Sequence, residues 1–223
     1  MKSPNKRTLT HNRLRTAVQK MVLGSKWQEV TVQDIAKDAD VSIGTFYNYY
    51  DSKDEALKDV RQCLSELLFK DISILVNTQS NAIEKLAILF KYFATLVSSK
   101  PSWADYLFRG AAFDERLEGG LQSLIIPMLL EGSKDNVFRV DNVKLAASFL
   151  EQGAFPIIKK AYEDGLTLND KDIAVIAKLI LSTVGVAEDQ LDTVSNQICP
   201  VTPLAPLPVS ILNYARQTTI GYV

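Results

Sequence analysis

The most constraining feature of the sequence is a pair of short helical segments joined by a tight turn between residues 31 and 47. Thr31 offers an N-cap hydroxyl, and Asp34 follows at the position where a capping box needs an acid. Ser42 offers a second N-cap soon afterwards, so the first helix must be short. Asp40 lies in the turn at residues 39–41, and it tolerates a left-handed backbone, although glycine adopts it more easily. Such a pair, framed by a basic first helix and a long fourth one, predicts a three-helix DNA-binding domain.

The residues from Thr31 to Lys53 resemble the signature of the TetR family of bacterial regulators. They read TVQDIAKDADVSIGTFYNYYDSK. The family pattern has Thr or Ser, Val, Ile-Ala, Ala-Gly-Val-Ser, Gly-Thr-(Leu or Phe)-Tyr, an aromatic pair and Ser-Lys at the same spacing. The resemblance extends over roughly residues 8–62. Val22, Lys26 and Asp40 stand where the family has Phe, Gly and Gly, and none of these departures removes a group that contacts DNA in the family.

Helical periodicity independently predicts an all-α fold of about nine helices. The first helix ends near Gly24, and Lys53 begins a long one. The resemblance implies a DNA-binding domain at residues 1–52 and a helical ligand-sensing and dimerisation domain at residues 53–190. Pro156 should bend the penultimate helix, expected at residues 141–163, or break one of its hydrogen-bonded turns. The last helix is expected at residues 172–187, and no strand-like alternation of any length occurs.

Several residues of the signature have a size or a functional group that suits contact with DNA. Gly44 lets a recognition helix approach the duplex closely, Tyr47 can donate to phosphate, and Asn48 is suited to bidentate contact with adenine. Ser42 is first of all an N-cap, and Phe46 and Tyr50 are expected in the domain core. The predicted DNA-binding residues are Thr31, Ser42, Ile43, Gly44, Thr45, Tyr47, Asn48, Tyr49 and Lys53.

The charge distribution agrees with nucleic-acid binding, although the net charge is −1. Residues 1–26 carry seven cations and no carboxylate. Such an asymmetry is typical of a phosphate-binding surface, and it also fits a solvated basic terminus. Lys6 and Arg7 could enter the minor groove as an arm or remain in solvent.

For the C-terminal half the resemblance implies a small-molecule pocket and a dimer interface. The helices at 141–163 and 172–187 have apolar faces wide enough to pair two subunits in a four-helix bundle. Aromatic residues with few charged neighbours favour an apolar or aromatic ligand, although each of them could equally be core packing. The predicted ligand-binding residues are Tyr92, Phe93, Trp103, Tyr106, Phe108, Phe113, Met128, Phe149 and Phe155.

Other functional classes find little support. His11 is the single histidine, so a Ser-His-Asp or Cys-His system would have to use a residue of the basic N-terminal segment. Cys63 and Cys199 are too few for a cysteine zinc site or a disulfide framework. We therefore expect no enzyme, metal or cofactor, and no membrane partner, since the longest apolar run is too short to span a bilayer. Without an apolar signal segment a cytoplasmic location is expected.

The favoured function is a homodimeric, sequence-specific regulator of transcription that binds double-stranded DNA. A repressor released from a palindromic operator by a small ligand is the default, and a helical adaptor without DNA affinity is the alternative. The extension at residues 191–223 has four prolines between positions 200 and 208, so no helix crosses it there. Its low charge favours docking on a surface, in the same subunit or a partner, over a loose tail.

Overall fold

A computed structural model describes residues 5–24, 27–108, 113–197 and 204–211, with the side chains of residues 113–120 excepted. These residues form helices and loops without a strand, so the all-α prediction is confirmed. The chain divides into two compact units, residues 1–68 with the segment from Ala205 onward, and Phe69–Leu204. We call them the N-terminal and C-terminal units and describe each by itself. No helix in the described part is long and apolar enough to cross a membrane.

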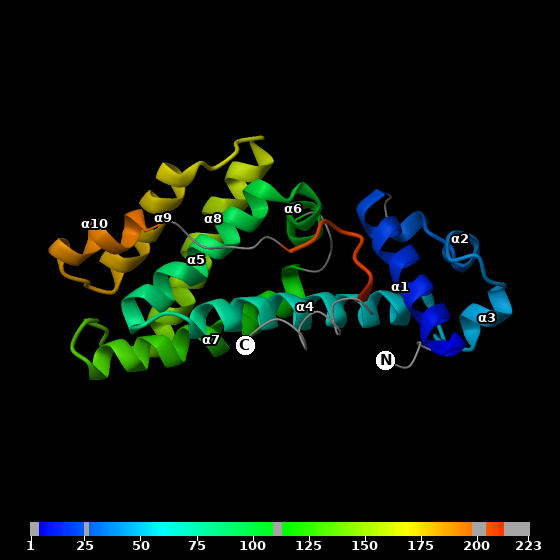
Figure 1. The fold of residues 1–223 in the computed structure, drawn as a ribbon, viewed down its shortest axis with the longest axis horizontal. Helices are drawn as coiled ribbons and strands as arrows, with labels where there is room; N and C mark the ends of the chain where they lie inside the picture. The colour runs from blue at the N-terminus through cyan, green and yellow to red at the C-terminus, as the bar shows by residue number, and fades with distance from the viewer. Residues whose placement is uncertain (1–4, 25–26, 109–112, 198–203, 212–223) are drawn as a thin grey trace. The chain divides into compact units, whose positions relative to one another are not determined.

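The N-terminal unit is a three-helix domain extended by the start of a long helix (Figure 1). Its elements are α1 (Lys6–Gly24), a 3-10 turn (Trp27–Glu29), α2 (Val32–Asp38), α3 (Ile43–Tyr47) and the first part of α4 (Lys53–Asn77). Leu14 and Val18 of α1, Ile35 of α2 and Phe46 of α3 are fully buried. These apolar side chains meet because each helix buries one stripe against the others.

The local signals that set the ends of α2 and α3 are confirmed. Thr31 caps α2 in a capping box with Asp34, and Ser42 caps α3 by accepting from the Thr45 backbone N–H at 3.0 Å. Asp40 adopts the left-handed backbone that the turn between the two helices requires, with φ of 51°. The side chain of Arg13 stabilises this turn by donating to the Asp40 carboxylate at 2.8 Å.

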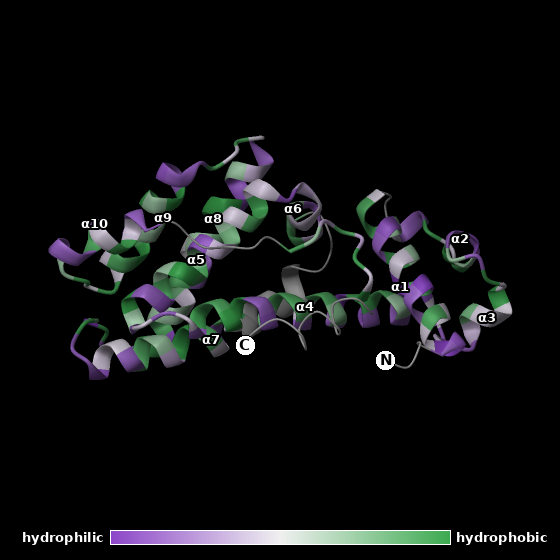
Figure 2. Cartoon of the chain, in the orientation of Figure 1, coloured by the Kyte–Doolittle hydropathy of each residue, from purple (hydrophilic) through white to green (hydrophobic). Residues whose placement is uncertain are grey.

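The C-terminal unit is built around α5 (Ala82–Ser99). The other helices are α6 (Pro101–Phe108), α7 (Phe113–Lys134), α8 (Val143–Glu163), α9 (Asp170–Thr183) and α10 (Glu188–Asn196). Helix α5 is buried along most of its length and contacts α6, α7, α8, α9 and α10. Apolar and polar residues occupy different faces of the surrounding helices, as packing against a central helix requires (Figure 2).

The end of the helical region differs from the sequence-based prediction. Helix α9 ends at Thr183 rather than near residue 187, and a tenth helix, α10, follows in the described part of the chain. The break occurs at Gly185, whose φ of 76° suits glycine and ends the helix. Pro156 lies inside α8, which continues past it to Glu163, and Pro127 likewise lies inside α7.

Residues 205–211 of the proline-rich extension belong to the N-terminal unit, where side chains of α1 hold them. The side-chain amide of Gln19 donates to the Val209 carbonyl at 3.0 Å and accepts from the Val209 N–H at 2.9 Å. Asn12 donates to the Ser210 hydroxyl at 3.0 Å. Within this segment these bonds agree with the preference for a docked extension, and residues 198–203 and 212–223 lie outside the described residues.

Candidate nucleic-acid interface

Helix α3 presents an outward face that the domain core does not use. Phe46 is fully buried and Tyr50 nearly so, as predicted, and together they fix the orientation of the helix. Ile43 and Tyr47 lie four residues apart on the opposite side, with 44% and 52% of their surfaces exposed. Asn48 is also exposed and forms the C-cap of α3. The packing therefore leaves three side chains available to an external partner.

Gly44 has no structural requirement within the protein. A Cβ atom at this position would meet nothing closer than the Ser42 hydroxyl, at 3.8 Å. Its backbone is helical, so neither crowding nor an unusual dihedral angle explains the missing side chain. Without a side chain at Gly44, a large partner can approach the backbone of α3 closely on this side.

Ser42, Thr45 and Thr31 are engaged in capping. The hydroxyls of Ser42 and Thr45 lie 2.8 Å apart, and the Thr31 hydroxyl donates to the Asp34 carboxylate at 2.6 Å. Thr31 and Ser42 are exposed, and Thr45 is half-buried. Capping fixes the local backbone in the free protein, while their predicted DNA contacts stay predictions.

Tyr49 borders a hollow of about 290 Å³ between the C-terminal end of α3 and the start of α1. Its hydroxyl donates to the Arg7 carbonyl at 3.1 Å, and its ring stacks on His11 with centroids 5.3 Å apart. Asn5, Thr8 and Asn48 line the hollow as well. These contacts hold the start of α1 next to the C-terminal end of α3.

Lys53 has a different environment from the one expected of a phosphate ligand. Its ammonium group donates to the carbonyls of Trp27, Gln28 and Val30 at 3.1, 3.2 and 2.7 Å. It also lies 5.6 Å from the Trp27 ring centroid. Three carbonyls use all three N–H donors of a lysine, so this geometry favours a structural role. The phosphate contact predicted for Lys53 stays a prediction.

Asp59 of α4 links α1 to Tyr50, which follows α3. Its carboxylate accepts from the Arg15 guanidinium at 2.7 and 2.6 Å and from the Tyr50 hydroxyl at 2.6 Å, and His11 Nε2 lies 3.4 Å away. Burial alone would raise the pKa of Asp59, but these donors outweigh it and hold the pKa well below its usual range. Burial raises the pKa of the neighbouring Cys63 thiol to about 11. The network therefore keeps the Asp59 carboxylate ionised, and this carboxylate connects α4 to α1 and to Tyr50.

Much of the basic character of α1 is neutralised internally. Arg13 pairs with Asp40, Arg15 with Asp59, and Lys20 with Asp38. Lys6 and Arg7, by contrast, are exposed and have no ion pair within the part of the chain that the structure describes. Arg7 also lines the hollow beside Tyr49. Free positive charge thus gathers at the start of α1, next to α3.

Three residues of this region were not among the predicted site residues: Arg7, His11 and Asp59. Arg7 was considered only as a minor-groove arm, and a weak signal for the other two was available. The signal is that polar residues stand at half-buried helical positions, namely His11, Arg15 and Asp59. Their partners are up to 48 residues distant, so the pairing itself could not be predicted from local pattern.

The predicted ligand-binding residues of the C-terminal unit are largely core residues. Tyr92, Phe93, Trp103, Tyr106, Met128 and Phe155 are buried, and Phe108 is half-buried. Phe93 and Phe155 pack edge to face with centroids 4.8 Å apart. Phe149 instead is 64% exposed, so in one protomer it does not line an enclosed cavity. Phe113 begins α7, and its side chain lies outside the described part.

Polar groups accompany these aromatic residues. The Tyr92 hydroxyl donates to the Asp71 carboxylate at 2.7 Å, and burial raises the pKa of Asp71. Gln122 donates to Glu151 at 3.1 Å. Each of these two carboxylates thus accepts a hydrogen bond from a side chain of the same unit.

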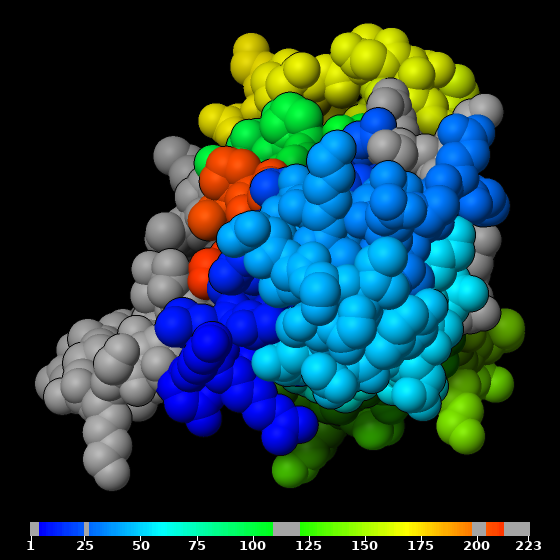
Figure 3. Space-filling model, turned by 90° about the vertical axis from the view of Figure 1, so that its right-hand side faces the viewer, coloured from blue at the N-terminus to red at the C-terminus, as the bar shows by residue number. Residues whose placement is uncertain are grey.

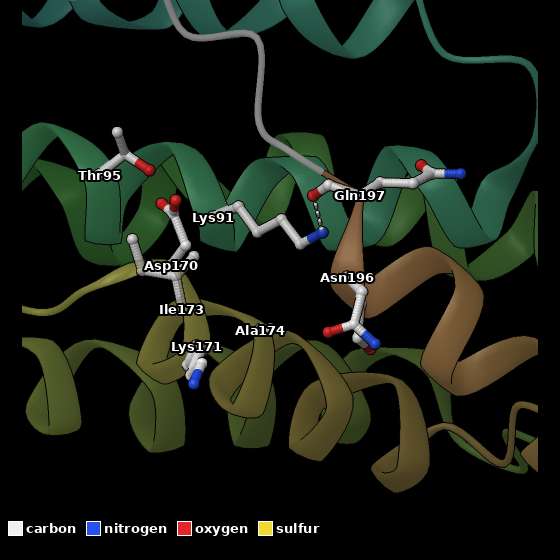
Figure 4. A pocket seen from close by; sticks show the side chains of 9 residues that line it. Lys91, Thr95, Asp170, Lys171, Ile173, Ala174, Asn196 and Gln197 are labelled. Carbon is white, nitrogen blue, oxygen red and sulfur yellow. Dashed lines mark hydrogen bonds between the residues drawn. The ribbon is translucent and has the colours of Figure 1, made fainter.

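A separate polar pocket of about 140 Å³ lies among α5, α9 and α10 (Figure 4). Lys91 of α5 reaches across it and donates to the carbonyls of Val194 and Gln197 at 2.7 and 2.8 Å. The buried ammonium group thereby holds the C-terminal end of α10. None of the predicted ligand-binding residues lines this pocket, and no metal-binding group of three acidic, histidine or cysteine residues occurs among the described residues.

Comparison with known proteins matches the helix-turn-helix segment by sequence and the fold of most of the chain by structure. Residues 27–60 match the family model described as bacterial regulatory proteins, tetR family. No curated protein matches significantly. Solved structures of similar fold include RolR in complex with resorcinol, with a TM-score of 0.67 and 20% identity over 88% of this chain and 97% of that chain. The transcriptional regulator FadR from Bacillus subtilis in complex with stearoyl-CoA has a TM-score of 0.63 and 18% identity over 78% and 97%. A gamma-butyrolactone receptor, described as ArpA-like, has a TM-score of 0.61 and 14% identity over 86% and 96%.

Proposed function

We propose that this chain, whose residues 27–60 match the model of the tetR family of bacterial regulatory proteins, is a sequence-specific DNA-binding regulator of transcription. The observation that carries the proposal is the outward face of α3, where Ile43, Tyr47 and Asn48 are exposed beside Gly44. A recognition helix needs such a face to reach base edges in the major groove. The exposed Arg7 at the start of α1 adds positive charge for the adjacent phosphates.

The regulator is proposed to act as a homodimer through α8 and α9. Leu145, Phe149 and Ile157 project from α8 at helical spacing, and Val175 and Leu179 do so from α9; all five are about half exposed or more. Large apolar side chains in two such stripes are typical of an interface rather than of a free surface. A two-fold dimer would present two recognition helices to the half-sites of a palindrome, about one duplex turn or a multiple apart.

The ligand is proposed to be small and mostly apolar or aromatic, and its binding to release the DNA. Structural neighbours have been solved with resorcinol and with stearoyl-CoA. In this chain the buried aromatic residues around Phe93 and Phe155, with Asp71 as a polar anchor, support a ligand of this class. Helix α4 includes residues of both units and offers a route by which a ligand that prefers one state could change the recognition-helix spacing.

Selection from random duplex DNA at near-physiological salt tests the proposal. The wild-type protein should enrich an inverted repeat, and Tyr47→Ala should lose it. Tyr47→Phe separates loss of the hydroxyl contact from loss of the ring, and Gly44→Ala serves as a fold-neutral probe. The alanine should leave folding intact or stabilise α3 by up to about 1 kcal/mol, yet it should weaken DNA binding by raising the helix surface.

A folded dimer that enriches no sequence, with and without resorcinol or stearoyl-CoA as probes, would contradict the proposal. The remaining interpretation would be a helical adaptor, whose binding to DNA lacks the steep salt dependence of phosphate contacts. Thermal unfolding with each probe tests ligand binding separately, because a bound ligand raises the midpoint in proportion to the logarithm of its concentration over Kd.

A further inference from the structure

The face of α1 opposite the domain core is covered by the C-terminal extension. Asn12, Thr16 and Gln19 follow the spacing i, i+4, i+7 and lie on this face, while Leu14 and Val18 point into the core. Gln19 is 2% exposed, which is unusual for a glutamine on an outer helical face. Figure 3 shows the segment of residues 204–211, in orange-red, beside α1 in dark blue.

The hydrogen bonds from Gln19 and Asn12 fix the register of the segment's backbone on α1. The Gln19 amide both donates to and accepts from Val209, which reproduces the two bonds of a hydrogen-bonded residue pair in an antiparallel sheet. Asn12 donates to the next residue, Ser210. A shift by one residue would leave the buried Gln19 amide unsatisfied, which is costly.

The segment itself has the pattern of a docked extended strand. Leu207 and Val209 are buried, whereas Pro206 and Pro208 are exposed. Successive side chains thus alternate between buried and exposed positions. The two prolines restrict the conformations of the free segment and so lower the entropy lost on docking. They also lack backbone N–H groups, which would otherwise need hydrogen-bond acceptors besides Gln19.

From these contacts we propose that the face of α1 marked by Asn12 and Gln19 is a peptide-docking surface, and that its occupant is residues 205–211 of the same chain. The chain leaves the N-terminal unit along α4 and returns to it at Ala205. Besides α4, the chain therefore connects the two units a second time, and the hydrogen bonds of the docked segment attach this second connection to α1. Since α1 also carries Arg7 and contacts Tyr49, release of the segment weakens DNA binding. This last step rests on the proposed function, whereas docking does not.

Chemical crosslinking tests the docking without DNA. Asn12→Cys and Ser210→Cys are combined in a Cys63→Ala, Cys199→Ser background and treated with a short bifunctional thiol reagent. The expected product is an intramolecular crosslink with the mass of one chain, and its yield should fall strongly when Gln19→Leu is added. A product with the mass of two chains would show docking in trans, and the absence of a product would show no docking; either result overturns the proposal.

Hydrogen exchange and DNA affinity complete the test. The Val209 amide should exchange about tenfold faster in Gln19→Leu, whereas the exposed control Gln28→Leu should leave it unchanged. Gln19→Leu and a chain that ends at residue 203 should both bind the selected operator at least about fivefold more weakly than wild type. Equal affinity in both variants would overturn the regulatory role. Should the wild type bind no DNA, crosslinking and exchange still decide whether the segment docks.

Discussion

Removing the negative charge of Asp59 should destabilise the N-terminal unit more than any other conservative change on α4. Its carboxylate accepts two hydrogen bonds from Arg15 and one from Tyr50, all between 2.6 and 2.7 Å. A hydrogen bond to a charged group contributes about 1.5–3 kcal/mol net. The side chain is 24% exposed and asparagine keeps one acceptor, so the effects will not add fully. We expect Asp59→Asn to lower the free energy of unfolding by about 2–4 kcal/mol.

Urea unfolding followed by tryptophan fluorescence measures this loss. Trp27 lies in the N-terminal unit and Trp103 in the other, so a Trp103→Phe background confines the signal to the unit that contains Asp59. With a slope of about 2 kcal/mol/M, the midpoint should fall by about 1–2 M urea. Glu66→Gln, an exposed neutralisation on the same helix, is the matched control and should change the free energy by less than about 0.5 kcal/mol.

The pH dependence of the difference provides an independent check. The native pKa of Asp59 is depressed, so its contribution is fully present above the unfolded pKa of about 3.9 and is lost as pH falls towards the native value. The difference between wild type and Asp59→Asn should be constant from pH 7 to 5 and shrink below about pH 4. A variant as stable as the control, or a difference that is the same at pH 7 and pH 3, would refute the reasoning.

Three further predictions concern the dimer, the charges and the thiol. Phe149→Glu should give monomers in sedimentation equilibrium, whereas Leu130→Glu, a similarly exposed site on α7, should leave the dimer intact; an unchanged dimer in the first variant would exclude this face. Lys53→Met should lower stability by about 1–3 kcal/mol with little change in the salt slope of DNA binding, while Arg7→Ala should reduce that slope by about 0.9; the reverse pattern would assign the phosphate contact to Lys53. Cys63 should react slowly with iodoacetamide at pH 8 in the folded protein, because burial raises its pKa to about 11, and a rate equal to that of the unfolded chain would contradict this environment.

The sequence determined the features that depend on neighbouring residues. The caps at Thr31 and Ser42 and the left-handed turn at Asp40 each involve groups within four residues of one another, so residue type and spacing suffice to predict them. The burial of Phe46 in α3 was likewise predicted, from its place in the TetR-like signature. The break at Gly185 was missed because an apolar pattern can continue through a residue that ends a helix.

Only the tertiary structure decided how distant polar groups are paired. Lys53 binds carbonyls more than 20 residues before it, and Asp59 binds Arg15 at a separation of 44 residues. Gln19 and Val209 are 190 residues apart, and nothing in either local pattern points to the other. A buried polar group must find a partner wherever the fold supplies one, and that choice is made by three-dimensional proximity rather than by sequence spacing. For this reason helix α3 and its exposed face could be predicted from the sequence, whereas the distant polar contacts that hold this helix in place could not.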